Sequence, residues 1–381
     1  MVRVIETARK KLTYSNVLAV VLFAVLVACS MYFVYHNYSF YDRPIAKVTE
    51  TNQIDHKEVT AEHGNKDEVF TQEILAEIMN GDKKGQQLRL TNEYSSSATY
   101  SQAYREGNDL FVSIDPASQD DNAELTGTIL DVKRDKYILL VAWLFVFILL
   151  LVGKKQGLYS VISLAVNAVL ISYALDMYIQ YANFGLLLMC ACSVVLFTLT
   201  SLLLVNGFNE KTYAAIAATL LGTLTSLLIT YFVMWITAEK GLRYEEMGFL
   251  TRPPQVVFMA GILIGSLGAV MDVAITMSSS IFGLYEKNKN IAVKALRTSG
   301  MEIGKDIMGT MTNILFFAYI SGSIPTMILY LKNEYPVSYT FSMNLSLELA
   351  RALAGGIGIV LTIPIGLYTA IFFVNRKRAK S

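Results

Sequence analysis

Asp272 is the residue of this chain with the clearest potential for chemistry, because it lies in an apolar run long enough to cross a membrane. A charge near the centre of a bilayer costs at least about 2.5–3.5 kcal/mol on insertion scales, so such a residue usually lines a polar pathway or has a partner. Desolvation favours the protonated carboxyl, which makes it a proton carrier, whereas a cationic partner keeps it ionised. We expect a functional role for Asp272, with a structural, hydrogen-bonded or ion-paired carboxylate as the alternative.

Other polar residues are spaced to line a path beside Asp272. Thr276 follows it by four positions, which places both on one helix face and starts a polar stripe toward the cytoplasm. In the next apolar segment, Asp306, Thr310 and Asn313 also share one side. Helices joined by a short connection are usually neighbours, so Thr310 and Asn313 are expected to hydrogen-bond across to the Asp272 helix. Asp306 is either a supporting acid near the cytoplasmic mouth or a plain helix cap.

Two further groups have mainly structural interpretations. Gly261, Gly265 and Gly268 are three and four positions apart, a spacing that lets a second membrane helix approach closely. We therefore expect these glycines to serve helix packing. Glu348 and Arg351 are three residues apart near the outer boundary of the last apolar run, where pairing lowers the cost of both charges. They are expected to form a structural ion pair.

These residues need membrane helices to position them, and the composition indicates many. The 381 residues are 54% hydrophobic and 17% charged, which is typical of a polytopic membrane protein. Runs of about 18 or more apolar residues predict about eight transmembrane helices. The predicted spans are 15–35, 136–153, 157–176, 183–206, 212–237, 255–280, 307–331 and 347–374.

Basic residues predict the orientation, because cytoplasmic flanks are enriched in Lys and Arg. Basic groups precede the first helix, separate the second from the third and the sixth from the seventh, and follow the eighth. With an even number of crossings and both termini in the cytoplasm, all four groups lie inside. They are Arg3, Arg9, Lys10 and Lys11; Lys154 and Lys155; Lys287, Lys289, Lys294, Arg297 and Lys305; and Arg376, Lys377, Arg378 and Lys380.

The same topology places a domain of about 100 residues outside the cell. We divide the chain into a tail and anchor helix (1–35), an extracellular β-rich domain (36–135) and a seven-helix transmembrane domain (136–381). Alternating apolar residues and turn signals predict four or five short strands and an OB-like barrel. The alternating segments are 73–79, 88–94, 110–115 and 125–132. Residues 50–69, polar and charged, are expected to be a mobile lead-in. The fold class is thus an all-α polytopic membrane protein with a small extracellular β domain.

Several classes of function are disfavoured. A net charge of +1 argues against binding to nucleic acid. The three histidines and three cysteines have no metal-ligand or disulfide spacing, so neither a metal nor another cofactor is expected. The chain has no zinc-protease motif, nucleophile elbow or Walker loop, and no catalytic residue is assigned. Two acids on adjacent helices leave an intramembrane enzyme as a minor alternative. Cleavage before Cys29, as in a lipoprotein, is disfavoured because apolar residues continue to Tyr35.

At three stretches the chain resembles the YibE/F membrane protein family. They are Gly268 to Thr276, Ser299 to Asn313, and Glu348-Leu-Ala-Arg351 with its glycine-rich continuation. The resemblance covers most of the chain and implies a multipass bacterial membrane protein described as a permease. A fainter similarity to the SecD/SecF export proteins lies in the acid after a glycine-rich stretch, but Ser278-Ser279-Ser280 replaces their arginine-glutamate run.

We therefore expect a permease or export component of the bacterial plasma membrane, coupled to protons through Asp272. The alternative is a non-transporting accessory or scaffold protein whose extracellular domain binds a partner. The expected partners are membrane lipids and a second membrane subunit or an extracellular protein. Residues 286–305 are basic and suit either a solvated cytoplasmic loop or a short amphipathic helix on the inner leaflet.

Overall fold

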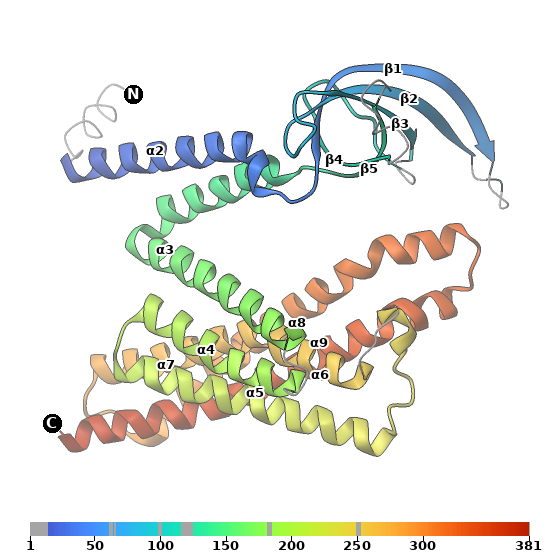
Figure 1. Ribbon diagram of the computed structural model, residues 1–381. Helices are drawn as coiled ribbons and strands as arrows, with labels where there is room; N and C mark the ends of the chain where they lie inside the picture. Colours follow the sequence, from blue (N-terminus) through green and yellow to red (C-terminus); the bar gives the residue numbers. More distant parts are fainter. Residues whose placement is uncertain are drawn as a thin grey trace, which may run out of the picture. The chain divides into compact units, whose positions relative to one another are not determined.

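A computed structural model of the protein describes residues 14–60, 64, 66–97, 101–115, 125–180, 185–248 and 253–380 (Figure 1). The chain divides into two compact units, residues 1–148 and 149–381. The basic residues expected before the first helix, Arg3, Arg9, Lys10 and Lys11, lie outside the described residues.

The first unit begins with the helix α2 (Tyr14–His36), followed by the short 3₁₀ helix η1 (Asn37–Phe40). α2 pairs with the first part of α3 (Asp135–Gln180). The ring of Phe23 meets that of Trp143 edge to face at 5.3 Å, and Trp143 Nε1 donates a hydrogen bond of 2.8 Å to Ser30 Oγ. An indole N–H in an apolar environment needs such an acceptor, so this bond fixes how the two helices face each other.

Five strands follow η1 and form a closed barrel in the order β1-β2-β3-β5-β4. Alternate residues point inward, as in Ile74, Ala76 and Ile78 of β2, all fully buried. Five strands is the number expected for an OB-like barrel, and the predicted small β domain is confirmed. The strands are β1 (Ile45–Thr60), β2 (Lys66–Ile78), β3 (Gln87–Ser95), β4 (Asp109–Ile114) and β5 (Leu125–Val132).

The prediction of a mobile lead-in over residues 50–69 is wrong. Most of this segment is the far half of β1 and the start of β2, which pair antiparallel up to Thr60 and Lys66 (Figure 1). Beyond Gln53 every residue of β1 is exposed, because this half of the hairpin extends past the barrel with both faces open to solvent. A hairpin with no buried face has no apolar alternation, so its sequence gives no strand signal.

Buried charges join the barrel to the helices within the first unit. Lys133, with only 1% of its side chain exposed, forms a salt bridge of 2.8 Å with Asp135 at the start of α3. Its ammonium also donates to the carbonyl of Val34 at the end of α2, and the Tyr41 hydroxyl donates to Asp135. Lys133, which directly follows β5, thus connects the end of the barrel to both α2 and α3.

The second unit contains the remainder of α3 and the helices that follow it. Together with α2, the described residues form seven apolar helical segments long enough to cross a membrane. The prediction of eight counted 136–153 and 157–176 separately, whereas both lie in α3, broken at the non-helical residue Lys154. The later elements are α4 (Leu186–Asn206), α5 (Glu210–Thr237), η3 (Tyr244–Met247), α6 (Pro254–Gly265), α7 (Leu267–Lys287), α8 (Val293–Lys332) and α9 (Val337–Lys380).

Two predicted helix limits need correction. α8 begins at Val293 rather than at residue 307, so most of the expected basic loop is the first part of this helix. α9 begins at Val337, ten residues before the expected position at residue 347. Both extensions are polar enough to escape a search for apolar runs, and their helical structure continues that of the membrane segments.

α9 packs against α5, α7 and α8 and uses glycines to do so. If Gly358 carried a Cβ atom, that atom would lie only 3.1 Å from Cγ2 of Val270 on α7. A Cβ atom on Gly366 would likewise lie 3.3 Å from Cβ of Met277. From α8, Thr312 lies against Gly356. Small residues at helix contacts let backbones come close, which drives association where the hydrophobic effect does not.

Candidate functional site

The depth of Asp272 can be measured along α9, which carries no charge over the stretch beside it. Because α7 meets α9 at Gly358 and again at Gly366, Asp272 is level with about residue 360 of α9. At 1.5 Å per residue, Arg351 is then roughly 14 Å away along α9 and Arg376 roughly 24 Å away in the other direction. No charged residue lies between Arg351 and Arg376 on that helix. This charge-free stretch of α9 is roughly 38 Å long, enough to cross the hydrocarbon core of a bilayer, which is about 30 Å thick.

The side chain of Asp272 points away from the core of its own chain and is exposed. The opposite face of α7 carries Val270, Val273, Met277 and Ile281, all completely buried. Among the residues that the structure describes, none forms a hydrogen bond or ion pair with the Asp272 carboxylate. Helical periodicity explains this arrangement, since the wide apolar face of α7 is the one that packs against α9.

The other residues of the expected path are level with Asp272 but do not enclose it. α8 meets α9 at Gly356 through Thr312 and at Ile363 through Gly304, so residues 306–310 lie at the depth of Asp272. Asp306, Thr310 and Asn313 are exposed, and Thr276 is half-buried.

The expected hydrogen bonds from Thr310 and Asn313 to the Asp272 helix are absent among the described residues, and that expectation is wrong within one chain. Apolar side chains fill the core against which both helices pack, including Val273 and Leu315, with Met308 and Met311 beside them. The polar faces of α7 and α8 remain on the surface of the bundle because the apolar faces are used for packing.

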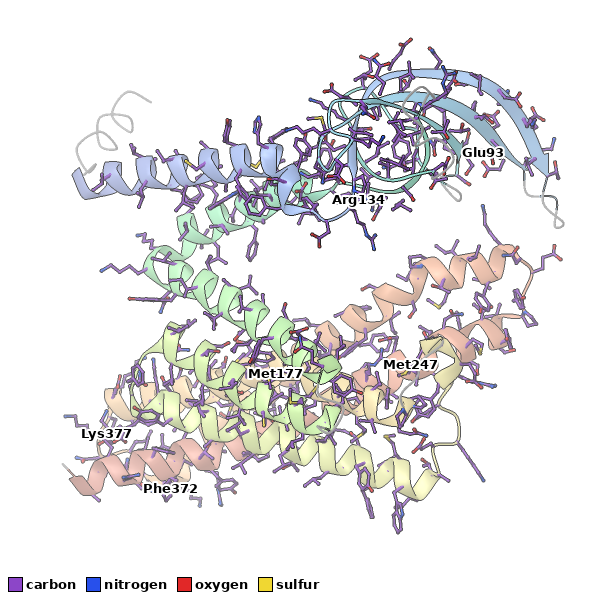
Figure 2. The ribbon with its side chains drawn as sticks, in the orientation of Figure 1. Glu93, Arg134, Met177, Met247, Phe372 and Lys377 are labelled. Carbon is purple, nitrogen blue, oxygen red and sulfur yellow. The ribbon has the colours of Figure 1, made fainter. Side chains whose placement is uncertain are left out.

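A polar stripe leads along α7 from Asp272 to a pocket at one end of the bundle. Thr276, Ser279, Gly283 and Glu286 follow Asp272 at intervals of three or four residues, so all five share one face. The pocket has a volume of about 500 Å³. Its lining includes Ser279, Gly283 and Glu286 of α7, Glu210 and Lys211 of α5, and Lys377 of α9. Lys377 is labelled near the C-terminal end of α9 in Figure 2.

A second charged group, Glu348 and Arg351 on α9, lies on the other side of Asp272 from this pocket. Arg351 is about seven turns from Lys377 along that helix. Glu348 and Arg351 form a salt bridge one turn apart on α9, and both side chains are about four-fifths buried. The guanidinium of Arg351 lies 5.6 Å from the ring centre of Phe258 on α6, a cation–π contact. Gly261 leaves room for it, since a Cβ there would be 3.7 Å from Arg351 Nε.

The glycines of α6 and α7 differ in what they pack against. Gly265 is in direct contact with the hydroxyl of Tyr319 on α8, and that buried oxygen has no hydrogen-bond partner among the described residues. Gly261 and Gly265 therefore receive polar side chains rather than a helix backbone. Gly268 has no atom within 4 Å of a Cβ position, so its predicted packing role is not fulfilled within this chain.

Glu246 of η3 joins the Glu348–Arg351 group from the connection between α5 and α6. Burial raises its pKa to about 7, the nearby charge of Glu348 adds to the shift, and Arg351 opposes it. Its Oε2 atom is buried and has no hydrogen-bond partner among the described residues. Burial and Glu239 likewise raise the pKa of the neighbouring Tyr244. The sequence offered no signal for Glu246, which lies in a short polar connection far from residue 348 along the chain.

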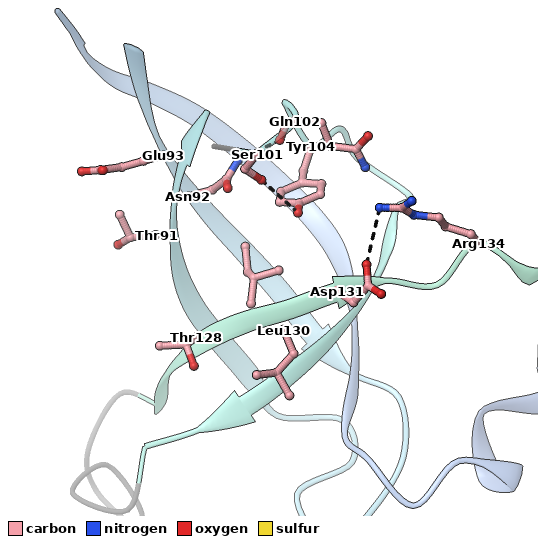
Figure 3. Close-up of a pocket in the computed structure, with 11 residues that line it drawn as sticks. Thr91, Asn92, Glu93, Ser101, Gln102, Tyr104, Thr128, Leu130, Asp131 and Arg134 are labelled. Atoms are coloured by element: carbon pink, nitrogen blue, oxygen red, sulfur yellow. Dashed lines mark hydrogen bonds and ion pairs between the residues drawn. The ribbon is translucent and has the colours of Figure 1, made fainter. Parts of the chain in front are cut away.

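The barrel has a pocket of its own, of about 580 Å³ (Figure 3). It opens where β3 and β5 separate, since their parallel pairing ends at Leu90 and Gly127. The pocket is lined by side chains of β3 and β5, of the loop before β4 and of Arg134 after β5. They offer amide, hydroxyl and charged groups, among them those of Asn92, Glu93, Tyr104, Asp131 and Arg134. Arg134 and Asp131 form a salt bridge of 3.5 Å at its rim (Figure 3).

Comparison with known families identifies both halves of the chain. The model described as YibE/F-like protein matches residues 141–376, and the model described as YibE/F family N-terminal domain matches residues 39–132. No curated protein and no solved structure matches. The first match contains Asp272, the Glu348–Arg351 pair and the lining residues of the pocket at the end of α7 other than Lys377. The second contains the five strands of the barrel.

Proposed function

This chain belongs to the YibE/F family, and from the placement of its charged side chains we propose that it transports a small solute across the bacterial plasma membrane with Asp272 as the proton-responsive group. The single observation behind the proposal is that this carboxylate lies level with the charge-free stretch of α9 and forms no ion pair among the described residues. A permanent ion pair would have fixed its charge. Without one, gain or loss of a proton can change how strongly this side chain prefers water over lipid.

The polar stripe of α7 offers protons a route between the Asp272 carboxyl and solvent. Thr276, Ser279 and Gly283 connect Asp272 with the pocket at the end of the helix, and hydroxyl groups can both donate and accept hydrogen bonds. The ionised carboxylate favours an arrangement in which water or a polar neighbour covers this face. The protonated carboxyl favours one in which the face meets lipid or an apolar surface. Alternation between the two arrangements is the proposed link between proton binding and transport.

We propose eight crossings with both termini in the cytoplasm. Lys154 has φ 50° and ψ −122°, which interrupts α3. Gly157 lies in direct contact with the carbonyl of Leu149, although residues eight apart on a continuous helix are about 12 Å apart along its axis. The chain therefore turns at this point, and each part of α3 has roughly the 20 residues that a crossing needs.

Purified full-length protein in liposomes tests the proposal. Proton flux is recorded with an internal pH dye while a panel of amino acids, peptides, sugars and inorganic ions is supplied on either side. Asp272→Asn removes the titratable group and roughly keeps its shape, so solute-dependent proton flux is expected to fall at least tenfold. Glu302→Gln, an exposed acid on the first part of α8, is the matched control and is expected to retain activity. Full flux in correctly inserted Asp272→Asn protein would refute the proposal.

The pocket in the barrel favours a second function, that of an accessory protein whose outer domain binds a partner. Its amides, hydroxyls and charges form a recognition surface independent of the membrane helices. Affinity capture with the full chain tests this function. A partner that is retained by wild type and by Asp272→Asn, but lost with Glu93→Ala together with Arg134→Ala, would support it. A partner whose binding ignores the barrel substitutions would not.

A further inference from the structure

The pocket at the end of α7 contains four charges of both signs. Glu210 and Lys211 come from the first turn of α5, Glu286 from the last turn of α7, and Lys377 from the end of α9. Within the described residues none of the four takes part in a salt bridge, although all line one cavity. Formal charges of two carboxylates and two ammonium groups cancel, so the pocket favours neither a simple anion nor a simple cation.

Glu210 is the carboxylate in this pocket with the greatest need of a partner. Its Oε2 atom is buried and has no hydrogen-bond partner among the described residues. The adjacent Asn209 cannot serve, because its amide nitrogen donates to the carbonyls of Asn206 and Gly207 and its amide oxygen caps Thr212. A buried carboxylate oxygen without a donor costs free energy, so this position calls for a donor from outside the protein.

The two lysines of the pocket, Lys211 and Lys377, need an anionic partner. The ammonium of Lys377 is held 5.8 Å from the ring centre of Phe282, a lining residue of the same pocket. This cation–π contact keeps the charge at the pocket without neutralising it. Lys211 lies one residue after Glu210 in the α5 first turn, where the helix dipole also favours an anion. An anionic group bound here would meet two ammonium groups and a positive helix end.

We infer that this pocket binds a zwitterion whose ammonium group contacts Glu210 and Glu286 and whose anionic group contacts Lys211 and Lys377. This inference rests on the proposed transport function and names the class of solute that it would carry: an amino acid, a short peptide or a similar molecule. A volume of about 500 Å³ suits such ligands. The polar stripe of α7 then starts from the bound solute and ends at Asp272.

Two sources can supply this chemistry, a free solute or the headgroup of phosphatidylethanolamine. Binding is therefore measured by titration calorimetry with the full chain in nanodiscs of phosphatidylglycerol alone and in nanodiscs that also contain phosphatidylethanolamine. L-Alanine and trialanine are the probes. Ethylamine and propionate, each with one of the two charges, are the matched controls. Equal binding in both lipids assigns the site to the solute, whereas loss of binding only with phosphatidylethanolamine assigns it to the headgroup.

Both charged sides of the pocket are then tested. Lys377→Met and Glu286→Gln lie near helix ends and are exposed, so they are expected to fold and to weaken zwitterion binding at least tenfold. Glu210→Gln should act in the same direction. Asp272→Asn should bind normally while losing proton flux, which separates failure of this inference from failure of the proposed function. Binding of ethylamine or propionate as strong as that of alanine, no measurable binding of either zwitterion in both lipids, or binding indifferent to all three pocket variants would overturn the inference.

Discussion

Lys133 and Asp135 form a salt bridge of 2.8 Å in which the lysine side chain is 1% exposed and the aspartate side chain 25% exposed. The lysine directly follows β5, which ends at Val132, and the aspartate is the first residue of α3, so this short interaction lies at the junction between the barrel and the helix. The ammonium also binds the Val34 carbonyl at 2.8 Å, which adds α2 to the same junction.

Loss of the Lys133 ammonium should loosen this junction. Lys133→Met is expected to lower the free energy of unfolding of the outer domain by about 2–4 kcal/mol, because it leaves the Asp135 carboxylate without its cation. Hydrogen exchange of the barrel amides in the full chain measures the effect. The neighbouring pair Arg134–Asp131 is more than 60% exposed on both sides, so Arg134→Met should cost less than about 1 kcal/mol. Equal effects of the two substitutions would contradict the assigned role of Lys133.

A methyl group at Gly304 should disturb the contact between α8 and α9. A Cβ there would overlap Ile363 Cγ2, whereas Gly309 on the same helix has open space at its Cβ position. Gly304→Ala is expected to destabilise the bundle by about 1–3 kcal/mol through overpacking. Gly309→Ala is expected to be neutral or slightly stabilising, because alanine favours helix. Thermal unfolding of both variants in the same detergent provides the comparison, and a Gly304→Ala midpoint at or above that of Gly309→Ala would argue against the close contact.

The raised pKa of Glu246 predicts a pH dependence of stability. The folded protein keeps a proton on this carboxyl up to about pH 7, whereas the unfolded chain releases it near the ordinary value of 4.5. The stability that this proton contributes is therefore complete below about pH 4.5 and is lost as the pH rises through about 7. Between pH 5 and 8, wild type should lose stability relative to Glu246→Gln, by an amount on the order of 1–3 kcal/mol.

Unfolding midpoints across that pH range test the assignment to Glu246. Glu245→Gln, an exposed neighbour in the same short helix, should keep the wild-type slope. An unchanged slope in Glu246→Gln would assign the titration to another group.

The turn within α3 predicts that Lys155 is accessible from the cytoplasm. In a chain whose Cys29, Cys190 and Cys192 are replaced by serine, Lys155→Cys should react with a membrane-impermeant maleimide in inside-out vesicles but not in intact cells. Arg105→Cys in the exposed loop before β4 should show the reverse pattern. Protection of Lys155→Cys from both sides would instead place this residue inside the membrane and reduce the number of crossings.

The sequence by itself determined the apolar segments and most of the strands, because both follow from patterns within a few residues. The runs predicted over 183–206 and 212–237 closely match α4 and α5, and the alternation over 125–132 coincides with β5. The same local reasoning missed the far half of β1 and the first parts of α8 and α9, where polar residues dominate both faces.

Only the tertiary structure decided which way these elements face. Asp272 was expected inside a protein-lined path, yet the close glycine contacts of α9 turn the apolar face of α7 inward and leave the carboxylate on the surface. Glu246 and Arg351, more than 100 residues apart, meet only when η3 folds over α9. Burial of Lys133, the separation of β3 from β5 and the four charges of the α7 pocket likewise depend on segments distant in the chain. Periodicity gives each helix a polar face, but the choice of neighbour decides what that face meets.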